Sequence, residues 1–210
     1  MKSYHISLIR HGQTKANEQG RYIGTTDFAL SDKGRSELYD LLDAYVYPKV
    51  ERVYSSPLER CTETAEILFP DTEMVIAEDF AELHFGKFEG KTADELIDDP
   101  DYRAWLKGGM DAKPPEGEGV SELCVRTYRG LQKILLEMME EDFRHVAIVT
   151  HAGVIANAIA CFGLPKFDPK QIKCNPGEGF EIMLTAQMWQ QAQAFEVLGL
   201  VPLLPEESDM

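Results

Sequence analysis

Two histidines in this chain each follow a strand-like apolar segment, a position from which an imidazole can do chemistry. The first, His11, comes after the mostly apolar run Ile6–Ile9 and stands between Arg10 and Gly12. A histidine can attack an electrophile or move protons near neutral pH. Arginine offers a rigid fork of donors for phosphate or carboxylate, and glycine lets the backbone turn sharply near a ligand. The tripeptide alone is also compatible with a surface turn in which His11 is solvated.

The second histidine, His151, repeats this arrangement. It ends the apolar segment His145–Thr150 and is followed by Ala152 and Gly153. Taken alone, a histidine in such a place is more often a satisfied core residue than a functional group. Its position at the carboxyl end of a predicted strand, as for His11, favours a functional role.

A third informative stretch is Ser56–Arg60, which follows the short predicted strand Arg52–Ser55. Ser56 and Glu59 have the spacing of a capping box, and Pro57 suits the first helical position. The free amide groups and the dipole of such a helix N-terminus favour an anion, and Arg60 in the first turn would add charge there. The alternative is that Arg60 packs along the helix flank.

Strands alternate with helices along the chain, which predicts an α/β domain with a mainly parallel sheet. In open sheets of this kind, ligands bind beyond the carboxyl ends of the strands. The three stretches above therefore converge on one edge, where a phosphoryl group is the matching ligand. The predicted strands are 6–9, 52–55, 74–77, 145–150, 180–185 and 195–200. The predicted helices begin at Ser31, Pro57 and Thr92 or span 121–139 and 154–162.

The length and charge of the chain limit its function. With 210 residues and 44% hydrophobic content, it can form a single domain over 1–210, or one domain with an insertion. An irregular excursion at about 80–120 is expected to cover the site, with residues 99–119 as its least regular part and Trp105 as its apolar anchor. The net charge of −15 argues against a nucleic-acid partner.

The four cysteines form no Cys-x-x-Cys pair and no zinc spacing with histidine. Three of them, Cys61, Cys124 and Cys161, lie in apolar helical patterns, where a reduced cysteine packs as a small hydrophobe. The chain also shows no signal peptide and no apolar run of membrane length. We therefore expect a cytoplasmic protein without a membrane partner, and we expect the tail after Pro202 to be loose.

Six segments together resemble the histidine phosphatase (phosphoglycerate mutase-like) superfamily. They occur in the family's order over about residues 4–162, and the combination is far more specific than any one segment. The segments are Leu8–Gly12, Arg21–Gly24, Leu30–Gly34, Ser55–Cys61, Glu82–Gly86 and His151–Gly153.

The resemblance implies a three-layer α/β/α sandwich and a covalent phosphohistidine mechanism that needs neither a metal nor another cofactor. It assigns His11 as the nucleophile and Glu82 as the acid and base, with Glu89 as the rival for that second role. The phosphoryl oxygens would be held by Arg10, Asn17, Arg60 and His151, and the rest of the substrate by Arg21, Tyr22 and Gly24.

Within the superfamily, the chain is most similar to α-ribazole phosphatase-like small phosphatases, which implies a small phosphorylated metabolite as substrate. Its sequence departs from theirs over Pro115–Ser121. If this segment faces the substrate, the preference for a particular leaving group differs from theirs. The enzymatic alternative is a cofactor-dependent phosphoglycerate mutase. Mutases carry an adjacent arginine pair in the excursion, whereas residues 99–119 hold only isolated cations at Arg103, Lys107 and Lys113. A catalytically silent phosphate-binding relative is the third possibility, and the sequence leaves the oligomeric state open.

Overall fold

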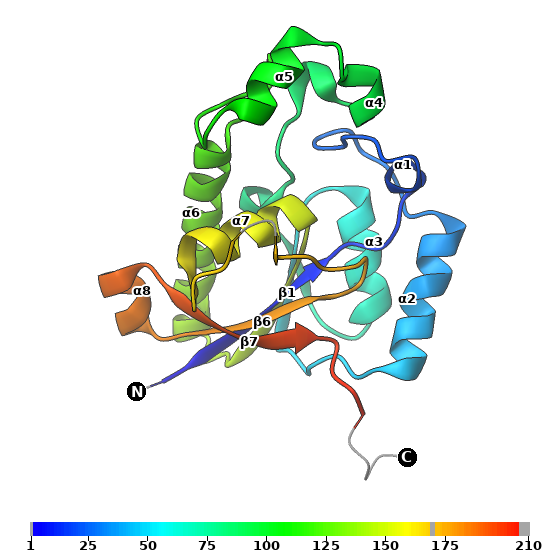
Figure 1. Cartoon of the computed structure of the whole chain (residues 1–210). Helices are drawn as coiled ribbons and strands as arrows, with labels where there is room; N and C mark the ends of the chain where they lie inside the picture. The colour runs from blue at the N-terminus through cyan, green and yellow to red at the C-terminus, as the bar shows by residue number, and fades with distance from the viewer. Residues whose placement is uncertain (1, 169–170, 206–210) are drawn as a thin grey trace.

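The computed structural model describes residues 2–168 and 171–205 and is built around a seven-stranded sheet (Figure 1). The strand order in this sheet is β3-β2-β4-β1-β6-β7-β5. The strands are β1 (Tyr4–Arg10), β2 (Arg52–Ser55), β3 (Met74–Ile76), β4 (His145–Thr150), β5 (Gly163–Leu164), β6 (Gly179–Leu184) and β7 (Phe195–Val201).

The sheet is mixed, but only β6 runs against the direction of the other strands in the described part of the chain. Strands β3, β2, β4 and β1 pair in parallel, and β5 pairs in parallel with β7. Strand β6 pairs antiparallel with both β1 and β7. The predicted mainly parallel sheet is therefore confirmed, with one reversed strand between β1 and β7.

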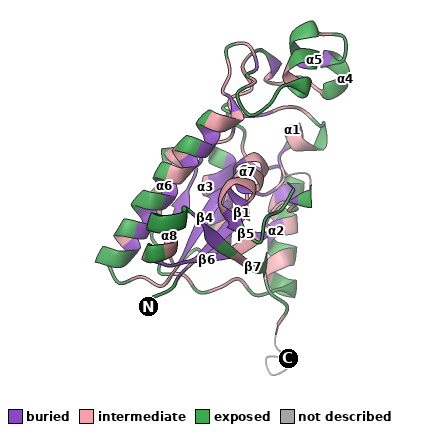
Figure 2. Ribbon diagram, turned by 60° about the vertical axis from the view of Figure 1, so that its left-hand side comes forward, coloured by how far each residue is buried: buried purple, intermediate pink, exposed green. Residues whose placement is uncertain are grey.

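Helices cover both faces of the sheet and make the three predicted layers. Helices α2 and α3 pack on one face, while α6 and α7 pack on the other. Burial concentrates on the central strands and on the inward sides of these helices (Figure 2). The helices are α1 (Lys15–Glu18), α2 (Asp32–Ala44), α3 (Glu59–Leu68), α4 (Ala93–Leu96), α5 (Pro100–Lys107), α6 (Val120–Glu140), α7 (Ala152–Phe162) and α8 (Ala186–Ala192).

The central strands supply side chains to both faces, which explains their continuous apolar sequences. In β4, Val146 and Ile148 join the core under α6 and α7, whereas Ala147 and Val149 join the core under α2 and α3. This alternation follows from the two-residue period of a strand. A strand covered by helices on both sides is expected to be apolar on both faces, as β4 is over Val146–Val149; β1 departs from this at the buried Ser7, whose hydroxyl is paired with His145 Nε2 at 2.9 Å.

The predicted capping box at Ser56 is wrong. Helix α3 begins at Glu59, after Leu58 at the N-cap, and neither Ser56 nor Leu58 caps it with a side-chain hydrogen bond. The reason is that the Ser56 amide still donates to Val149 O at 2.9 Å, which prolongs the contact between β2 and β4 by one residue. The Glu59 amide is bound by Asp27 instead, at 2.8 Å. The Ser56 hydroxyl is therefore not used for helix capping and instead bonds to His151 Nε2 in the site described below.

The excursion is more regular than its sequence suggested. Within it, α5 begins with Asp99 as N-cap and Pro100 at the first helical position, a helix start that the sequence analysis treated as irregular. The helix predicted to begin at Thr92 is confirmed as α4, and Thr92 and Glu95 form a capping box at its start. Aromatic and apolar side chains form a separate small core here, made by Phe88, Leu96 and Tyr102 with Tyr22, Phe85 and Trp105 packed against it.

The C-terminal part of the chain adds one helix and one contact that were not predicted. Thr185 caps α8, accepting from the Met188 amide at 3.1 Å, and Trp189 of α8 stacks on Tyr128 of α6. Leu203 pairs with Val46 through an isolated bridge, so the chain is held just after Pro202; residues 206–210 lie outside the described part. Among the residues that the structure describes, no helix is long and apolar enough to cross a bilayer.

Candidate active site

The two histidines meet because β1 and β4 are paired in parallel. Arg10 lies opposite Thr150, and the His11 amide donates to Thr150 O at 2.9 Å. The next residue of each strand therefore enters the same space. The imidazole centroids of His11 and His151 are 5.1 Å apart with an interplanar angle of 64°, and both side chains are buried.

The hydrogen bonds of His11 select one tautomer. Its Nδ1 lies 2.7 Å from Gly12 O. Because a carbonyl oxygen can only accept, Nδ1 carries the hydrogen and Nε2 keeps its lone pair. Burial, together with the nearby charges of Arg60 and Arg10, lowers the pKa of His11 to about 3. The hydrogen bond to the Gly12 carbonyl raises this pKa, but it only partly offsets the other effects. The imidazole is therefore neutral at physiological pH and presents a nucleophilic nitrogen.

Arg60 is a buried cation whose guanidinium is held by backbone oxygens. Its Nη2 donates to Gly24 O at 2.8 Å and its Nη1 donates to Thr26 O at 3.1 Å. Nη2 also lies 3.3 Å from His151 Nδ1. The cation thus has a fixed place beside both histidines before any ligand arrives.

His151 is held from both ring nitrogens. Because Arg60 can only donate, His151 Nδ1 is the acceptor, and the hydrogen on Nε2 is donated to Ser56 Oγ at 2.8 Å. Burial and the proximity of His11 and Arg60 lower the pKa of His151 well below its ordinary value. A ligand oxygen would have to replace the Ser56 hydroxyl to reach Nε2.

Arg10 presents a donor that the described residues do not use. Its Nη1 donates to Cys174 O at 2.9 Å, but its buried Nε has no partner there. A buried N–H without an acceptor carries a desolvation cost that a bound anion would remove. With Arg60, this donor makes the surroundings of His11 suited to an anionic group.

The Glu82 carboxyl group lies at the start of α7. Oε1 accepts from the Leu83 amide at 2.8 Å and Oε2 accepts from the Gly153 amide at 3.2 Å. Burial raises the pKa of Glu82, and these amides and two nearby arginines only partly oppose that effect. A carboxyl group with a raised pKa can carry a proton to a reacting oxygen.

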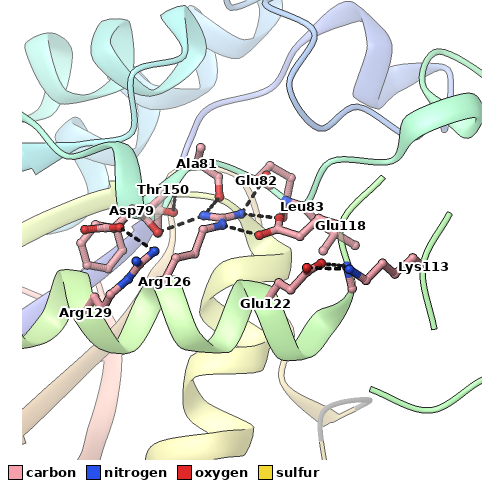
Figure 3. Close-up of polar contacts among 12 residues, drawn as sticks. Asp79, Ala81, Glu82, Leu83, Lys113, Glu118, Glu122, Arg126, Arg129 and Thr150 are labelled. Atoms are coloured by element: carbon pink, nitrogen blue, oxygen red, sulfur yellow. Dashed lines mark hydrogen bonds and ion pairs between the residues drawn. The ribbon is translucent and has the colours of Figure 1, made fainter. Parts of the chain in front are cut away.

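Arg126 of α6 fixes the segment that carries Glu82 (Figure 3). Its guanidinium donates to the carbonyl oxygens of Asp79, Ala81 and Glu82 at 2.6–3.0 Å and forms a two-pronged ion pair with Glu118 of the excursion. The sequence analysis missed this residue. The available signal was its place between Leu123 and Gly130 on the buried face of the helix, where an arginine needs partners.

Glu89 supports the loop that holds Arg60. Its carboxylate accepts from the amides of Gly24, Thr25 and Phe85 at 3.0–3.2 Å and from Thr26 Oγ1 at 2.9 Å. The carbonyl groups of that same loop bind Arg60. The link runs from Glu89 through the backbone of residues 24–26 to the guanidinium.

Other sequence-predicted residues surround this centre. Asn17 Oδ1 accepts from the amide and hydroxyl of Thr14, which caps α1. Arg21 donates to Gly90 O and to Glu95 Oε2, and Tyr22 bonds to Tyr102 through its hydroxyl at 2.8 Å. The structure therefore brings together His11, Arg10, Arg60, Glu82, His151 and the Gly24 backbone, while Arg21 and Tyr22 contact the excursion.

The model of the histidine phosphatase superfamily (branch 1) matches residues 6–194. The chain belongs to this superfamily. Over 157 residues it is 31% identical to the adenosylcobalamin/alpha-ribazole phosphatase of Salmonella typhimurium, covering 73% of this chain and 76% of that one. It is 25% identical over 177 residues to a 2,3-bisphosphoglycerate-dependent phosphoglycerate mutase of Gloeobacter violaceus, covering 80% and 78%.

Solved structures share the fold of this histidine phosphatase. The alpha-ribazole phosphatase from Shigella flexneri has a TM-score of 0.78 at 23% identity, covering 97% of this chain and 99% of that one. The phosphoglycerate mutase from Bacillus anthracis has a TM-score of 0.77 at 22% identity, covering 94% and 92%. The relatives include phosphatases and mutases, so the chain is an enzyme of a superfamily that works on phosphate groups.

A substitution of Gly153 would displace the Glu82 carboxyl group, because the three atoms nearest to an added Cβ all belong to Glu82. A Cβ at this position would lie 2.4 Å from Glu82 Oε1. We expect Gly153→Ala to lower turnover by about 10- to 100-fold through misplacement of the carboxyl group, while the helix keeps its stability because alanine favours helix. Steady-state kinetics and thermal melting measure the two effects. Gly199→Ala, where nothing lies within 4 Å of the added Cβ, is the control. Unchanged turnover in Gly153→Ala would show that Glu82 is placed by other contacts.

Glu89 can be tested against Glu95, a second carboxylate of the excursion, which binds Arg21 and the Thr92 amide and, within the described residues, makes no hydrogen bond to the loop that holds Arg60. In Glu89→Gln an amide NH2 replaces one acceptor oxygen among four donors, so we expect kcat/KM to fall about tenfold or more for every leaving group. Glu95→Gln is expected to stay within about twofold. If Glu89→Gln instead slows poor leaving groups selectively, Glu89 is an acid and not a support for Arg60.

Proposed function

We propose that this histidine phosphatase hydrolyses phosphomonoesters through a phosphohistidine formed on His11. The observation that supports this most strongly is the neutral His11 imidazole, with its free Nε2 between Arg10 and Arg60. An unprotonated nitrogen among fixed cations suits attack on a phosphoryl group, because the site lowers the pKa of the nucleophile and stabilises its target at once.

Two displacements complete the proposed reaction. His11 Nε2 attacks phosphorus, the bond from phosphorus to the ester oxygen breaks, and Glu82 gives its proton to the departing alkoxide. Water then attacks the phosphorus of phosphohistidine while the ionised Glu82 takes a proton from it, and the N–P bond breaks to release phosphate and neutral His11. One carboxyl group can serve both steps because each step returns it to the state that the other needs.

The phosphoryl oxygens are assigned to the cationic donors around His11. Arg10 Nε, which lacks a partner among the described residues, and the Arg60 guanidinium supply the charge. His151 would contribute its Nε2–H, and Asn17 its side-chain amide. The Nε of Arg10, unpartnered within the described part of the chain, and the fixed Arg60 guanidinium support a low reorganisation cost for these two donors, whereas His151 would first have to release Ser56 Oγ.

Hydrolysis is favoured over the mutase alternative by the cations of the excursion. Arg103 donates to Ile97 O and pairs with Asp98, and Lys113 pairs with Glu122. Residues 99–119 contain a single arginine, so they hold no adjacent arginine pair that could clamp a substrate carboxylate, and Arg103 and Lys113 are already engaged by these partners. A silent relative is disfavoured because His11, His151 and Glu82 are all present and arranged around one centre.

The substrate class follows from the relatives and from the excursion. A small phosphorylated metabolite such as α-ribazole phosphate is the first candidate, given the names of the similar phosphatases. A pocket of about 530 Å³ lies between the excursion and α6, and its lining includes His84, Glu118 and Arg126. His84 is two residues from Glu82, so this pocket is our candidate for the rest of the substrate.

The nucleophile can be tested with p-nitrophenyl phosphate in the presence of a chelator. We expect hydrolysis without added metal, inhibition by vanadate, and a loss of about a thousandfold or more in His11→Ala. His5→Ala is the matched control, because His5 lies at the amino end of the same strand and contacts Glu181. Activity that survives in His11→Ala would overturn the assignment, and loss of activity with chelator would overturn metal independence.

The acid role of Glu82 predicts a dependence on leaving group and on pH. Glu82→Gln should slow esters of weakly acidic alcohols most, since good leaving groups need no proton. In the wild type, kcat/KM should fall as the pH rises through the raised pKa of Glu82, because the acid must be protonated. His11, with its pKa of about 3, should impose no acid limb above about pH 4. Equal slowing of all leaving groups would contradict the acid role.

A further inference from the structure

Two cysteines lie against each other at the contact between α6 and α7, away from the chemistry described above. The Sγ atoms of Cys124 in α6 and Cys161 in α7 are 3.0 Å apart, and both cysteines are free thiols. A disulfide needs an S–S distance of about 2.05 Å. The two sulfur atoms would therefore have to approach by only about 1 Å, which side-chain rotation and a small helix shift can provide.

The two thiols differ in a way that suits disulfide exchange. Cys124 is buried, whereas Cys161 is partly exposed, so an oxidant from solution reaches Cys161 first. Donation from the Cys124 thiol and the positive charge of Lys166 lower the pKa of Cys161, although burial opposes them. Lys166 is held there by a 2.9 Å bond from Nζ to Cys161 O. The thiolate is the attacking species in exchange.

The remaining cysteines are less suited to this chemistry. Cys61 is fully buried beside His151, and burial raises the pKa of its thiol to about 12. Burial likewise raises the pKa of Cys174 to about 11. Among the cysteines, which all fall in the described ranges, Cys124 and Cys161 are the pair placed for oxidation.

The helices that this pair would join both support Glu82. Arg126, two residues after Cys124, binds the backbone that carries Glu82, and Gly153 in the first turn of α7 binds its carboxylate. Cys161 lies at the other end of α7, about 12 Å along the helix axis from Gly153. A bond at this point would fix α6 to α7 without entering the active site.

We propose that Cys124 and Cys161 form a reversible disulfide by exchange with small-molecule disulfides of the glutathione class, and that this bond latches α6 to α7. The Cys161 thiolate attacks the external disulfide, forming a mixed disulfide and releasing one thiolate. Cys124 then loses its proton and attacks the Cys161 sulfur, which releases the second thiolate. Two protein thiols are oxidised and one external disulfide is reduced to two thiols. The inference does not depend on the proposed function.

The test exposes the reduced, folded protein to oxidised glutathione and follows its intact mass, its free thiols and its melting temperature. We expect a loss of about 2 Da and of two thiols, reversed by excess reduced glutathione. Peptide mapping should recover the segments of Cys124 and Cys161 joined. Since the crosslink closes a loop of the unfolded chain, the melting temperature of the oxidised form should rise by about 5–10 °C.

Three variants separate this latch from unspecific oxidation. Cys124→Ala should stop at a glutathione adduct on Cys161, Cys161→Ala should lose the reaction, and Cys174→Ser should still form the internal bond. A wild-type protein that keeps all its thiols, carries only adducts, or joins a different pair would overturn the proposal. An oxidised form that melts no higher than the reduced form would overturn the latch.

Discussion

The structure depends on keeping one imidazole neutral inside a cationic site. His11 loses its water shell on burial, and the guanidinium groups of Arg10 and Arg60 further disfavour its protonated form. The same arginines must themselves be held in a buried place, which is costly without partners. For Arg60 that cost is offset by the carbonyl groups of Gly24 and Thr26. His11, Arg10 and Arg60 are thus each held by a backbone carbonyl group of their own: Gly12 O for His11, Cys174 O for Arg10, and Gly24 O and Thr26 O for Arg60.

The sheet places the two histidines, whereas Arg60 and Glu82 are positioned by contacts with the excursion and α6. Glu89 orders the loop that binds Arg60, and Arg126 orders the segment that carries Glu82. Glu118 connects Arg126 to the excursion. The segment that was predicted to cover the site therefore also contributes to the positions of Arg60 and of Glu82, the proposed phosphate-binding cation and the proposed acid. This arrangement couples any change in the excursion to the chemistry, not only to substrate choice.

Much of this could be predicted from the sequence, and the failures have physical causes. The apolar runs of β1 and β4 and their polar ends placed His11 and His151 at one edge, because parallel strands align their carboxyl ends. Ser56 was wrongly predicted to cap a helix, because a capping pattern involves only neighbouring residues in the sequence. The Ser56 amide instead bonds to Val149 O in β4, a contact between distant residues that the pattern does not reveal. Arg126 was missed because three of its partners are carbonyl groups of residues 79–82, more than forty positions away in the sequence. Only its place in α6 pointed to a need for partners, and nothing in the sequence indicates which groups they are.

The most direct test of a nucleophilic His11 is to trap the phosphorylated protein. A labelled phosphomonoester would be mixed with enzyme, quenched within one turnover, and the label mapped by peptide analysis. The account predicts a phosphoryl group on Nε2 of His11 that is stable to alkali and lost in acid, as expected of a phosphoramidate. Label on another residue, or turnover with no phosphoenzyme at any quench time, would contradict it.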